Sequence, residues 1–193
     1  AQDRLDVVPH ITGGKMRRVR TVALVIALAA PTMTFAQATP ALAKPGAEIN
    51  KLSAMMVGTW TYEGSAKAGP FSPAGKVTGT DTYEMGPGGF SVPHRWEEKG
   101  PLGTVKGLEV MSYDAAKKVY TYNYFSSAGE MGAGTGTWTG NTIVFSGSGI
   151  TYEGKQAWGR CTWTIANPTN FTVKCDGSAD GKTWINGTFE GKF

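Results

Sequence analysis

The feature that most constrains this 193-residue chain is a run of short alternating segments from Val57 to Phe193. Polar and apolar side chains alternate within each segment, and glycine, proline, asparagine and aspartate gather between the segments. This pattern is typical of antiparallel strands that bury one face. We predict strands at residues 57–65, 76–85, 89–98, 103–113, 118–126, 131–139, 141–147, 150–165, 170–177 and 182–193.

Strands of this number and spacing form either a sandwich or a barrel. Glycines inside the predicted strand 131–139 favour the tight coiling of a barrel. Ahead of the strands, Ile49, Leu52, Met55 and Met56 lie at helical spacing. They predict a short amphipathic helix over 47–56, with its apolar stripe against the open end of the barrel. We therefore expect one all-β domain over residues 47–193.

The first 46 residues have a different character. A basic segment, Met16–Arg20, precedes the apolar run Val22–Ala30, and small residues follow. This is the layout of a secretory signal peptide, which we place at 16–38. A membrane anchor is the alternative, but the run is shorter than the roughly 20 residues that a spanning helix needs. We interpret residues 1–15 as a non-native upstream extension and 39–46 as a flexible linker.

This interpretation predicts a periplasmic or secreted bacterial protein with no transmembrane segment after signal cleavage. It also accounts for the basic charge. Of the 19 basic and 15 acidic residues, five basic and two acidic residues lie in 1–38, which leaves 14 and 13, or a net charge of +1. No run of lysine or arginine remains there, so we expect no nucleic-acid partner.

Two cysteines in an exported chain favour a disulfide over a metal site. Cys161 and Cys175 flank a turn at residues 166–170. If Ile165 faces Phe171 across the turn, alternation places the two cysteines directly opposite each other on the apolar face. We predict a structural disulfide; two buried free thiols are the alternative.

Four motifs carry a family resemblance: Gly58-Thr-Trp60, Tyr113-Asp-Ala-Ala-Lys-Lys-Val-Tyr120, Gly136-Thr-Trp-Thr-Gly140 and Ser178-Ala-Asp-Gly-Lys182. Over residues 48–193 the chain resembles a bacterial family known as domain of unknown function 1579. A helix followed by Gly-x-Trp also resembles the opening of lipocalin-like (calycin) barrels. The resemblance implies an antiparallel calycin barrel of about ten strands with a short N-terminal helix, and no established activity. The chain departs from true lipocalins in having no arginine on the last strand to stack on Trp60.

A hairpin around residues 86–89 holds the candidate acid–base pair. With Met85 opposite Phe90, Asp81 lies opposite His94, the only histidine of residues 39–193. An aspartate that orients an imidazole is a working proton-transfer pair, so both are candidate catalytic residues. A structural ion pair, or a histidine at the barrel mouth bonded to water, is the alternative. A bulge at Pro93 would shift this register.

The same register directs Tyr83, Phe90, Val92 and Trp96 into the barrel as candidate ligand-binding residues. On the next candidate strand, Tyr120, Tyr122 and Tyr124 alternate with residues of mixed character. Facing inward, they would line a cavity; facing outward, they would pack under a loop or a partner. The periodicity does not choose between these two arrangements. Trp60 is interpreted as a core residue.

We expect no cofactor and no metal site. The serines show no Gly-x-Ser-x-Gly elbow, and a lone histidine cannot build a three-ligand zinc site. The glycines of 132–136 lack the following helix of a phosphate loop.

Three functions remain. The first is an exported barrel that binds a small, largely apolar molecule, with Asp81 and His94 as its polar anchor. The second is an isomerase, cyclase or hydrolase on the same barrel, with His94 as base, Asp81 as its orienting group and a tyrosine as donor. The third is a filled barrel that acts through its outer surface as an envelope interaction module.

Overall fold

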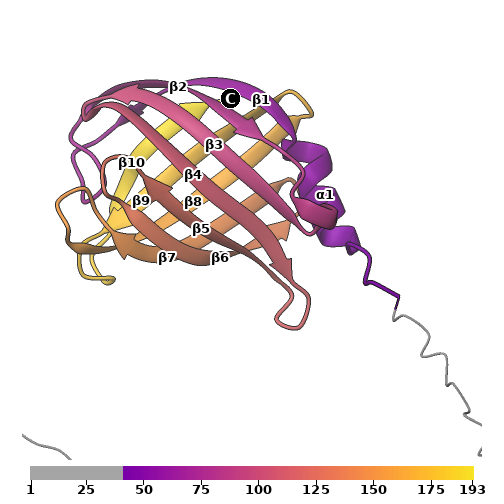
Figure 1. The fold of residues 1–193 in the computed structure, drawn as a ribbon. Helices are drawn as coiled ribbons and strands as arrows, with labels where there is room; N and C mark the ends of the chain where they lie inside the picture. Colours follow the sequence, from indigo (N-terminus) through magenta and orange to yellow (C-terminus); the bar gives the residue numbers. More distant parts are fainter. Residues whose placement is uncertain (1–40) are drawn as a thin grey trace, which may run out of the picture. The chain divides into compact units, whose positions relative to one another are not determined.

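The computed structural model describes residues 41–193, so the predicted extension and signal peptide lie outside the described residues. These described residues form one α-helix and ten strands (Figure 1). The helix is α1 (Ala47–Met56). The strands are β1 (Gly58–Ala66), β2 (Gly75–Tyr83), β3 (Ser91–Gly100), β4 (Gly103–Asp114), β5 (Val119–Ser126), β6 (Met131–Thr139), β7 (Thr142–Ile150), β8 (Gln156–Asn167), β9 (Asn170–Ser178) and β10 (Ile185–Lys192), with a 3₁₀ turn, η1 (Pro87–Gly89), between β2 and β3.

The strands form a closed antiparallel barrel in which each strand pairs with its neighbours in sequence. The barrel closes where Glu63–Ala66 of β1 pair with Phe189–Lys192 of β10. Closure leaves no unpaired sheet edge, which is the usual way for a meander of this length to satisfy its backbone. The predicted all-β barrel and the helix over 47–56 are confirmed.

Two predicted strand boundaries are wrong. The turn between β7 and β8 lies at Thr151–Lys155, where the Thr151 amide donates to the Lys155 carbonyl at 2.8 Å. The predicted strands 141–147 and 150–165 place the break at residues 148–149 instead, but both of these residues lie within β7. Strand β10 begins at Ile185 rather than 182, because the Asp180 carboxylate accepts backbone hydrogen bonds in a tight turn before it.

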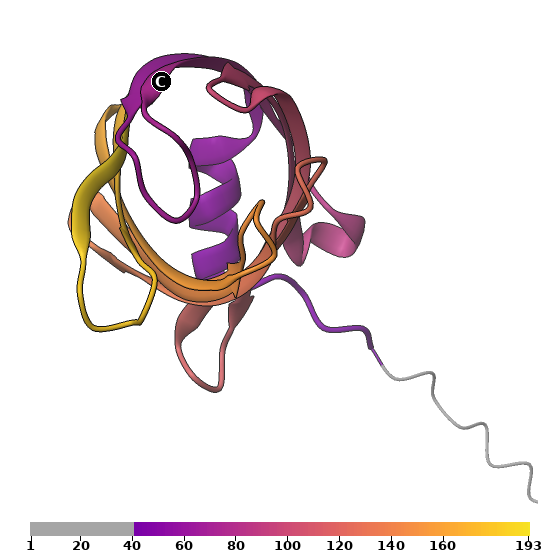
Figure 2. The ribbon, with the colours of Figure 1, turned by 90° about the vertical axis from the view of Figure 1, so that its left-hand side faces the viewer.

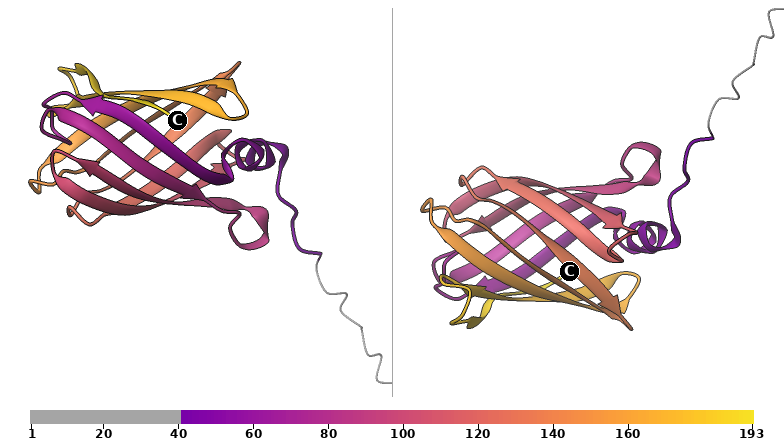
Figure 3. Two further views of the ribbon diagram at one scale, coloured as in Figure 1. Left: turned by 90° about the horizontal axis from the view of Figure 1, so that it is seen from above. Right: turned by 90° about the horizontal axis from the view of Figure 1, so that it is seen from below.

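The helix closes one end of the barrel. Its apolar face buries Ile49, Leu52 and Met56 against barrel residues. In Figure 2 the helix crosses the far end of the barrel, and both views of Figure 3 place it at this same end. Two hydrogen bonds hold it there: the Tyr120 hydroxyl donates to the Glu48 carboxylate at 2.7 Å, and the Trp60 indole donates to the Met56 carbonyl at 2.8 Å. This end is therefore filled with side chains.

The predicted hairpin of β8 and β9 is confirmed. Ile165 pairs with Phe171 and Cys161 with Cys175, and the two sulfur atoms form a disulfide. The bridge joins adjacent strands on the inner face of the sheet. Among residues 41–193, helices long and apolar enough to cross a bilayer are not found.

Candidate functional site

The barrel encloses a cavity of about 350 Å³ beyond the helix-end core. This volume lies at the lower end of the range of small-molecule sites, roughly 300–1,000 Å³. Most of the wall is aromatic or aliphatic, and the side chain of Phe71, from the loop between β1 and β2, contributes at the other end. The aromatic lining comprises Tyr62, Phe71, Tyr83, Trp96, Tyr122, Tyr124, Phe145, Trp163, Phe189 and Phe193.

Glycines on neighbouring strands make room for these rings. Trp96 of β3 pairs with Gly107 of β4, and Tyr62 of β1 pairs with Gly79 of β2. A Cβ atom at either glycine would collide with the ring of its partner. Because a bare glycine leaves the sheet surface open, each ring can lie across it instead of standing upright in the cavity. The same arrangement recurs for Tyr124 with Gly132, Tyr122 with Gly134 and Phe145 with Gly136.

The hairpin that carries the candidate acid–base pair has a different register from the one predicted. Tyr83, not Asp81, pairs with His94, and Asp81 pairs with Trp96. The Gly86 amide donates to the Ser91 carbonyl at 2.9 Å, so the turn occupies residues 87–90 rather than 86–89. Two successive glycines, 88 and 89, take up the positive φ values of this turn. A shift of two residues keeps every side chain on its face.

The shift changes the role of Phe90. It lies in the turn, outside the strand, with 44% of its surface exposed, so its predicted place in the cavity is wrong. Val92 does face inward, but it is fully buried in the core beneath α1 and does not line the cavity. Tyr83 and Trp96 both line the cavity.

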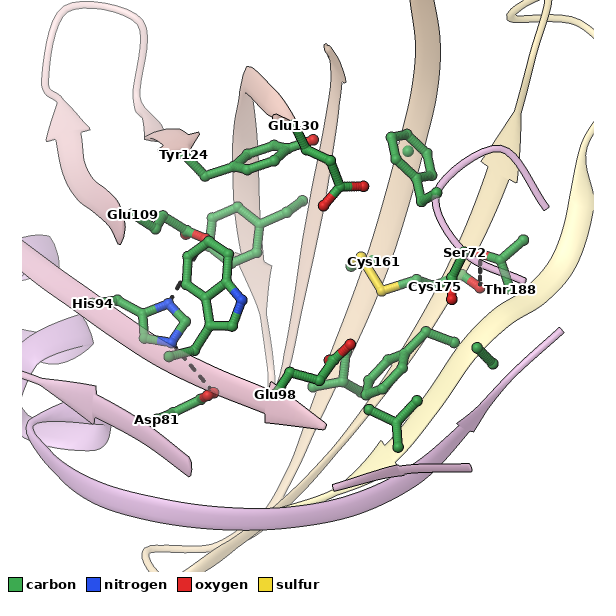
Figure 4. A pocket seen from close by; sticks show the side chains of 18 of the residues that line it. Ser72, Asp81, His94, Glu98, Glu109, Tyr124, Glu130, Cys161, Cys175 and Thr188 are labelled. Atoms are coloured by element: carbon green, nitrogen blue, oxygen red, sulfur yellow. Dashed lines mark hydrogen bonds and ion pairs between the residues drawn. A yellow bond between two sulfur atoms is a disulfide. The ribbon is translucent and has the colours of Figure 1, made fainter. Parts of the chain in front are cut away.

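Asp81 and His94 meet diagonally across the hairpin, although they do not pair. The His94 Nε2 atom lies 3.3 Å from Asp81 Oδ2, and its Nδ1 atom lies 3.8 Å from Glu109 Oε2 (Figure 4). The imidazole is 7% exposed and stacks on the ring of Tyr83 at 4.0 Å between centroids. Neither ring nitrogen, nor Asp81 Oδ1, makes a well-directed hydrogen bond within the described residues, so the contacts are those of an ion pair.

These surroundings favour the charged form of His94. Burial alone lowers the pKa of an imidazole, but Asp81 and Glu109 outweigh it and raise the pKa of His94 to about 9. The Tyr83 hydroxyl donates to Asp81 Oδ2 at 3.3 Å, and burial next to this carboxylate raises the pKa of Tyr83 as well. At neutral pH His94 is therefore an imidazolium between Asp81 and Glu109, and the phenol of Tyr83 beside it is neutral.

The tyrosines of β5 face inward but have two different roles. Tyr120 is buried under α1 and does not line the cavity. Tyr122 and Tyr124 line it, with their ring centroids 6.4 Å apart. Burial raises the pKa of Tyr122 to about 12, so it remains a neutral hydrogen-bonding group across the physiological range.

Sequence reasoning missed four carboxylates of the cavity wall: Glu98, Glu109, Glu130 and Asp176. Glu98 and Glu109 have the same strand parity as Trp96 and Met111, so the alternation that placed His94 inside was sufficient to find them. Glu130 lies just before β6, where alternation gives no guidance. The Tyr62 hydroxyl donates to Glu98 at 2.9 Å, and Ser126 donates to Glu130 at 3.1 Å.

Within the part of the chain that the structure describes, no group of three histidine, cysteine or acidic side chains is arranged to hold a metal ion. The two carboxylates at His94 lie on opposite edges of the ring, each next to a nitrogen.

Residues 44–189 match the model of a family described as "Protein of unknown function (DUF1579)". The chain belongs to this family. Among solved structures, it is similar to the crystal structure of Rv2717c from M. tuberculosis, with a TM-score of 0.57 and 12% sequence identity over 77% of this chain and 97% of that one. At that identity the similarity concerns the fold alone. No curated protein matches the chain.

Proposed function

We propose that this DUF1579 barrel binds a small, largely apolar molecule inside the cavity. The observation that carries the proposal is the cavity itself: about 350 Å³ of space in a barrel whose other end is filled. Its wall combines aromatic rings with a few convergent polar groups, which is the usual composition of a small-molecule site. A filled barrel that acts only through its outer surface would not need such a space.

The enzyme alternative has weaker support. A general base must be unprotonated at the working pH, but the raised pKa of His94 keeps it charged at neutral pH. Both ring nitrogens also face carboxylates of the protein, so neither is directed at a substrate. We assign the Asp81–His94–Glu109 group to shaping the polar end of the binding site.

The test is binding of N-phenyl-1-naphthylamine, a neutral dye whose emission rises in apolar surroundings. Gly159 of β8 lines the cavity, and a Cβ atom there meets only the Phe71 ring, at 3.6 Å. The leucine side chain of Gly159→Leu should therefore occupy part of the cavity volume that the dye needs, and should weaken dye binding by about tenfold or more. Thr164→Leu, at an exposed position of the same strand, is the control and should bind like the wild type. Absence of dye binding, or binding that Gly159→Leu leaves unchanged, would contradict the proposal.

We also propose that the protein works outside the cytoplasm. The disulfide between Cys161 and Cys175 supports this location, because such bridges persist in oxidising compartments. Cell fractionation followed by thiol alkylation and intact mass measurement is the test. A cytoplasmic, fully reduced protein would refute it.

A further inference from the structure

The charges that line the cavity are strongly one-sided. Five carboxylates line it, and four of them, from Asp81, Glu98, Glu109 and Glu130, have no lysine or arginine partner within the described residues. His94 is the one histidine of the lining, and among the described lining residues lysine and arginine are absent. His94 lies between Asp81 and Glu109, so its single positive charge is shared by two acids. The two remaining glutamates have no cationic partner within the described residues.

The fifth lining carboxylate, that of Asp176, has the cationic partner that the other four lack among lysine and arginine side chains. Asp176 is held by the guanidinium of Arg160 at 2.7 Å and by a backbone amide. Glu98 and Glu130 instead accept single hydrogen bonds from neutral hydroxyl groups. Burial and, to a smaller extent, the charge of a neighbouring acid raise the pKa of both glutamates, so the surroundings disfavour the ionised state of each.

An independent observation points to a missing partner. Asp81 is 4% exposed and lies in the cavity wall, and its Oδ1 atom has no hydrogen-bond partner among residues 41–193. Buried carboxylate oxygens are normally satisfied, and an unsatisfied one is costly. Figure 4 shows Glu98 and Glu130 directing their carboxylates into the same space that Asp81 borders. The acceptors therefore converge on the interior.

We propose that the ligand of this cavity is an organic cation: a protonated amine on an aromatic or aliphatic skeleton. Its ammonium group would lie at Glu98 and Glu130, and its skeleton would lie against the aromatic wall. This inference rests on the proposed binding function and specifies the class of molecule that is bound.

Three physical effects favour this class. An ammonium group supplies the N–H donors that the carboxylates lack, and hydrogen bonds between charged groups are about twice as strong as neutral ones. The faces of Trp96 and Tyr124, which also line the cavity, attract cations. A carboxylate or phosphate ligand would instead meet like charges in a partly apolar space, which disfavours it. The volume equals that of roughly a dozen waters, so the molecule is small.

The test compares three ligands with one skeleton: 2-(1-naphthyl)ethylamine, 2-(1-naphthyl)ethanol and 1-naphthaleneacetate. Affinities of the full chain for each are measured at pH 7.5 by titration calorimetry. We expect the amine to bind on the order of tenfold tighter than the alcohol, as a charged hydrogen bond exceeds a neutral one, and the acetate to bind weakest.

The paired variant Glu98→Gln/Glu130→Gln keeps side-chain size but removes both charges. It should abolish the preference for the amine, so that the amine and the alcohol bind with similar affinity, and binding of N-phenyl-1-naphthylamine shows that the cavity still accepts a neutral molecule. Glu97→Gln is the matched control, because Glu97 is the exposed neighbour of Glu98 on the outer face and pairs with Lys106. This variant should retain the full preference.

The outcomes separate the two proposals. If the alcohol binds and the amine binds no tighter, the cation inference is overturned and the binding function stands. If the preference persists in the paired variant, these glutamates do not recognise the ligand and the inference is again overturned. If neither the three ligands nor the neutral dye binds, the proposed function falls and the inference falls with it.

Discussion

Raising the pH from 6 to 9 should lower the free energy of unfolding by about 3 kcal/mol through His94 alone. The folded-state pKa is about 9, against 6.5 for an unperturbed histidine. A difference of this size, at 1.36 kcal/mol per unit, gives a total of roughly 3 kcal/mol. Because the folded pKa is the higher one, the stabilisation is fully present below pH 6.5 and is lost as the pH rises through 9. The side chain is buried, so solvent screening reduces this figure little.

The assay combines a titration with unfolding curves. Apart from His10, His94 is the only histidine of the chain, so its ring resonance in NMR spectra is assigned by a His10→Asn variant. The resonance should titrate with a midpoint near 9. Urea unfolding at pH 6 and 9 then measures the free-energy change. Glu98→Gln/Glu130→Gln is the appropriate background, because raised carboxyl pKa values also cost stability as the pH rises from about 4.5.

Asp81→Asn tests the assigned cause. It removes the nearer of the two charges that hold the imidazolium, so the midpoint of His94 should fall. Glu97→Gln, on the outer face of the same barrel wall, should leave the midpoint unchanged. A wild-type midpoint at or below 6.5 would refute the reasoning, because it would mean that desolvation outweighs both carboxylates.

Three further perturbations probe the packing. Gly107→Ala should destabilise the barrel by about 1–3 kcal/mol and shift tryptophan fluorescence, because the new Cβ atom collides with the indole of Trp96. Gly159→Ala is the control, since a Cβ atom there makes only ordinary van der Waals contact; equal effects of the two variants in urea unfolding would contradict this account. Tyr120→Phe removes the hydrogen bond to α1 and should cost about 1 kcal/mol, which the same measurement checks; no loss would mean that the bond is not formed in solution. Replacing Cys161 and Cys175 together by alanine opens a loop with a sequence separation of 14 and should cost about 3 kcal/mol, seen as a lower melting temperature; an unchanged temperature would refute a structural role.

Local patterns predicted much of the fold because the barrel is built from local pairings. Every strand pairs with its sequence neighbours, so alternation and turn residues carried the information for nine of its ten interfaces, and only the pairing of β1 with β10 is distant. The predicted register of the β8–β9 hairpin is correct because its turn is short and its residues allow a single turn position. That of the β2–β3 hairpin is not, because three glycines and a proline at 86–89 allow more than one turn position.

The register error shows which parts of a site a sequence can predict. A slip of two residues keeps the parity of a strand, so Asp81, Tyr83, His94 and Trp96 face inward in either register. Depth along the barrel, however, depends on the register itself. The slip moved Phe90 into the turn, and α1 occupies the end where Val92 and Tyr120 lie.

The boundary between core and cavity therefore had to come from the structure, because it is set by how far one helix enters the barrel. Ile49, Leu52 and Met56 fill the layer of Val92 and Tyr120, and the next layer begins at His94. At that level charged side chains join the aromatic wall: His94 lies between Asp81 and Glu109, and covering these groups with apolar side chains alone would carry a desolvation cost. The cavity begins at this layer, and the organic cation proposed above would bring its carboxylates the charge and hydrogen-bond donors that the apolar face of α1 lacks.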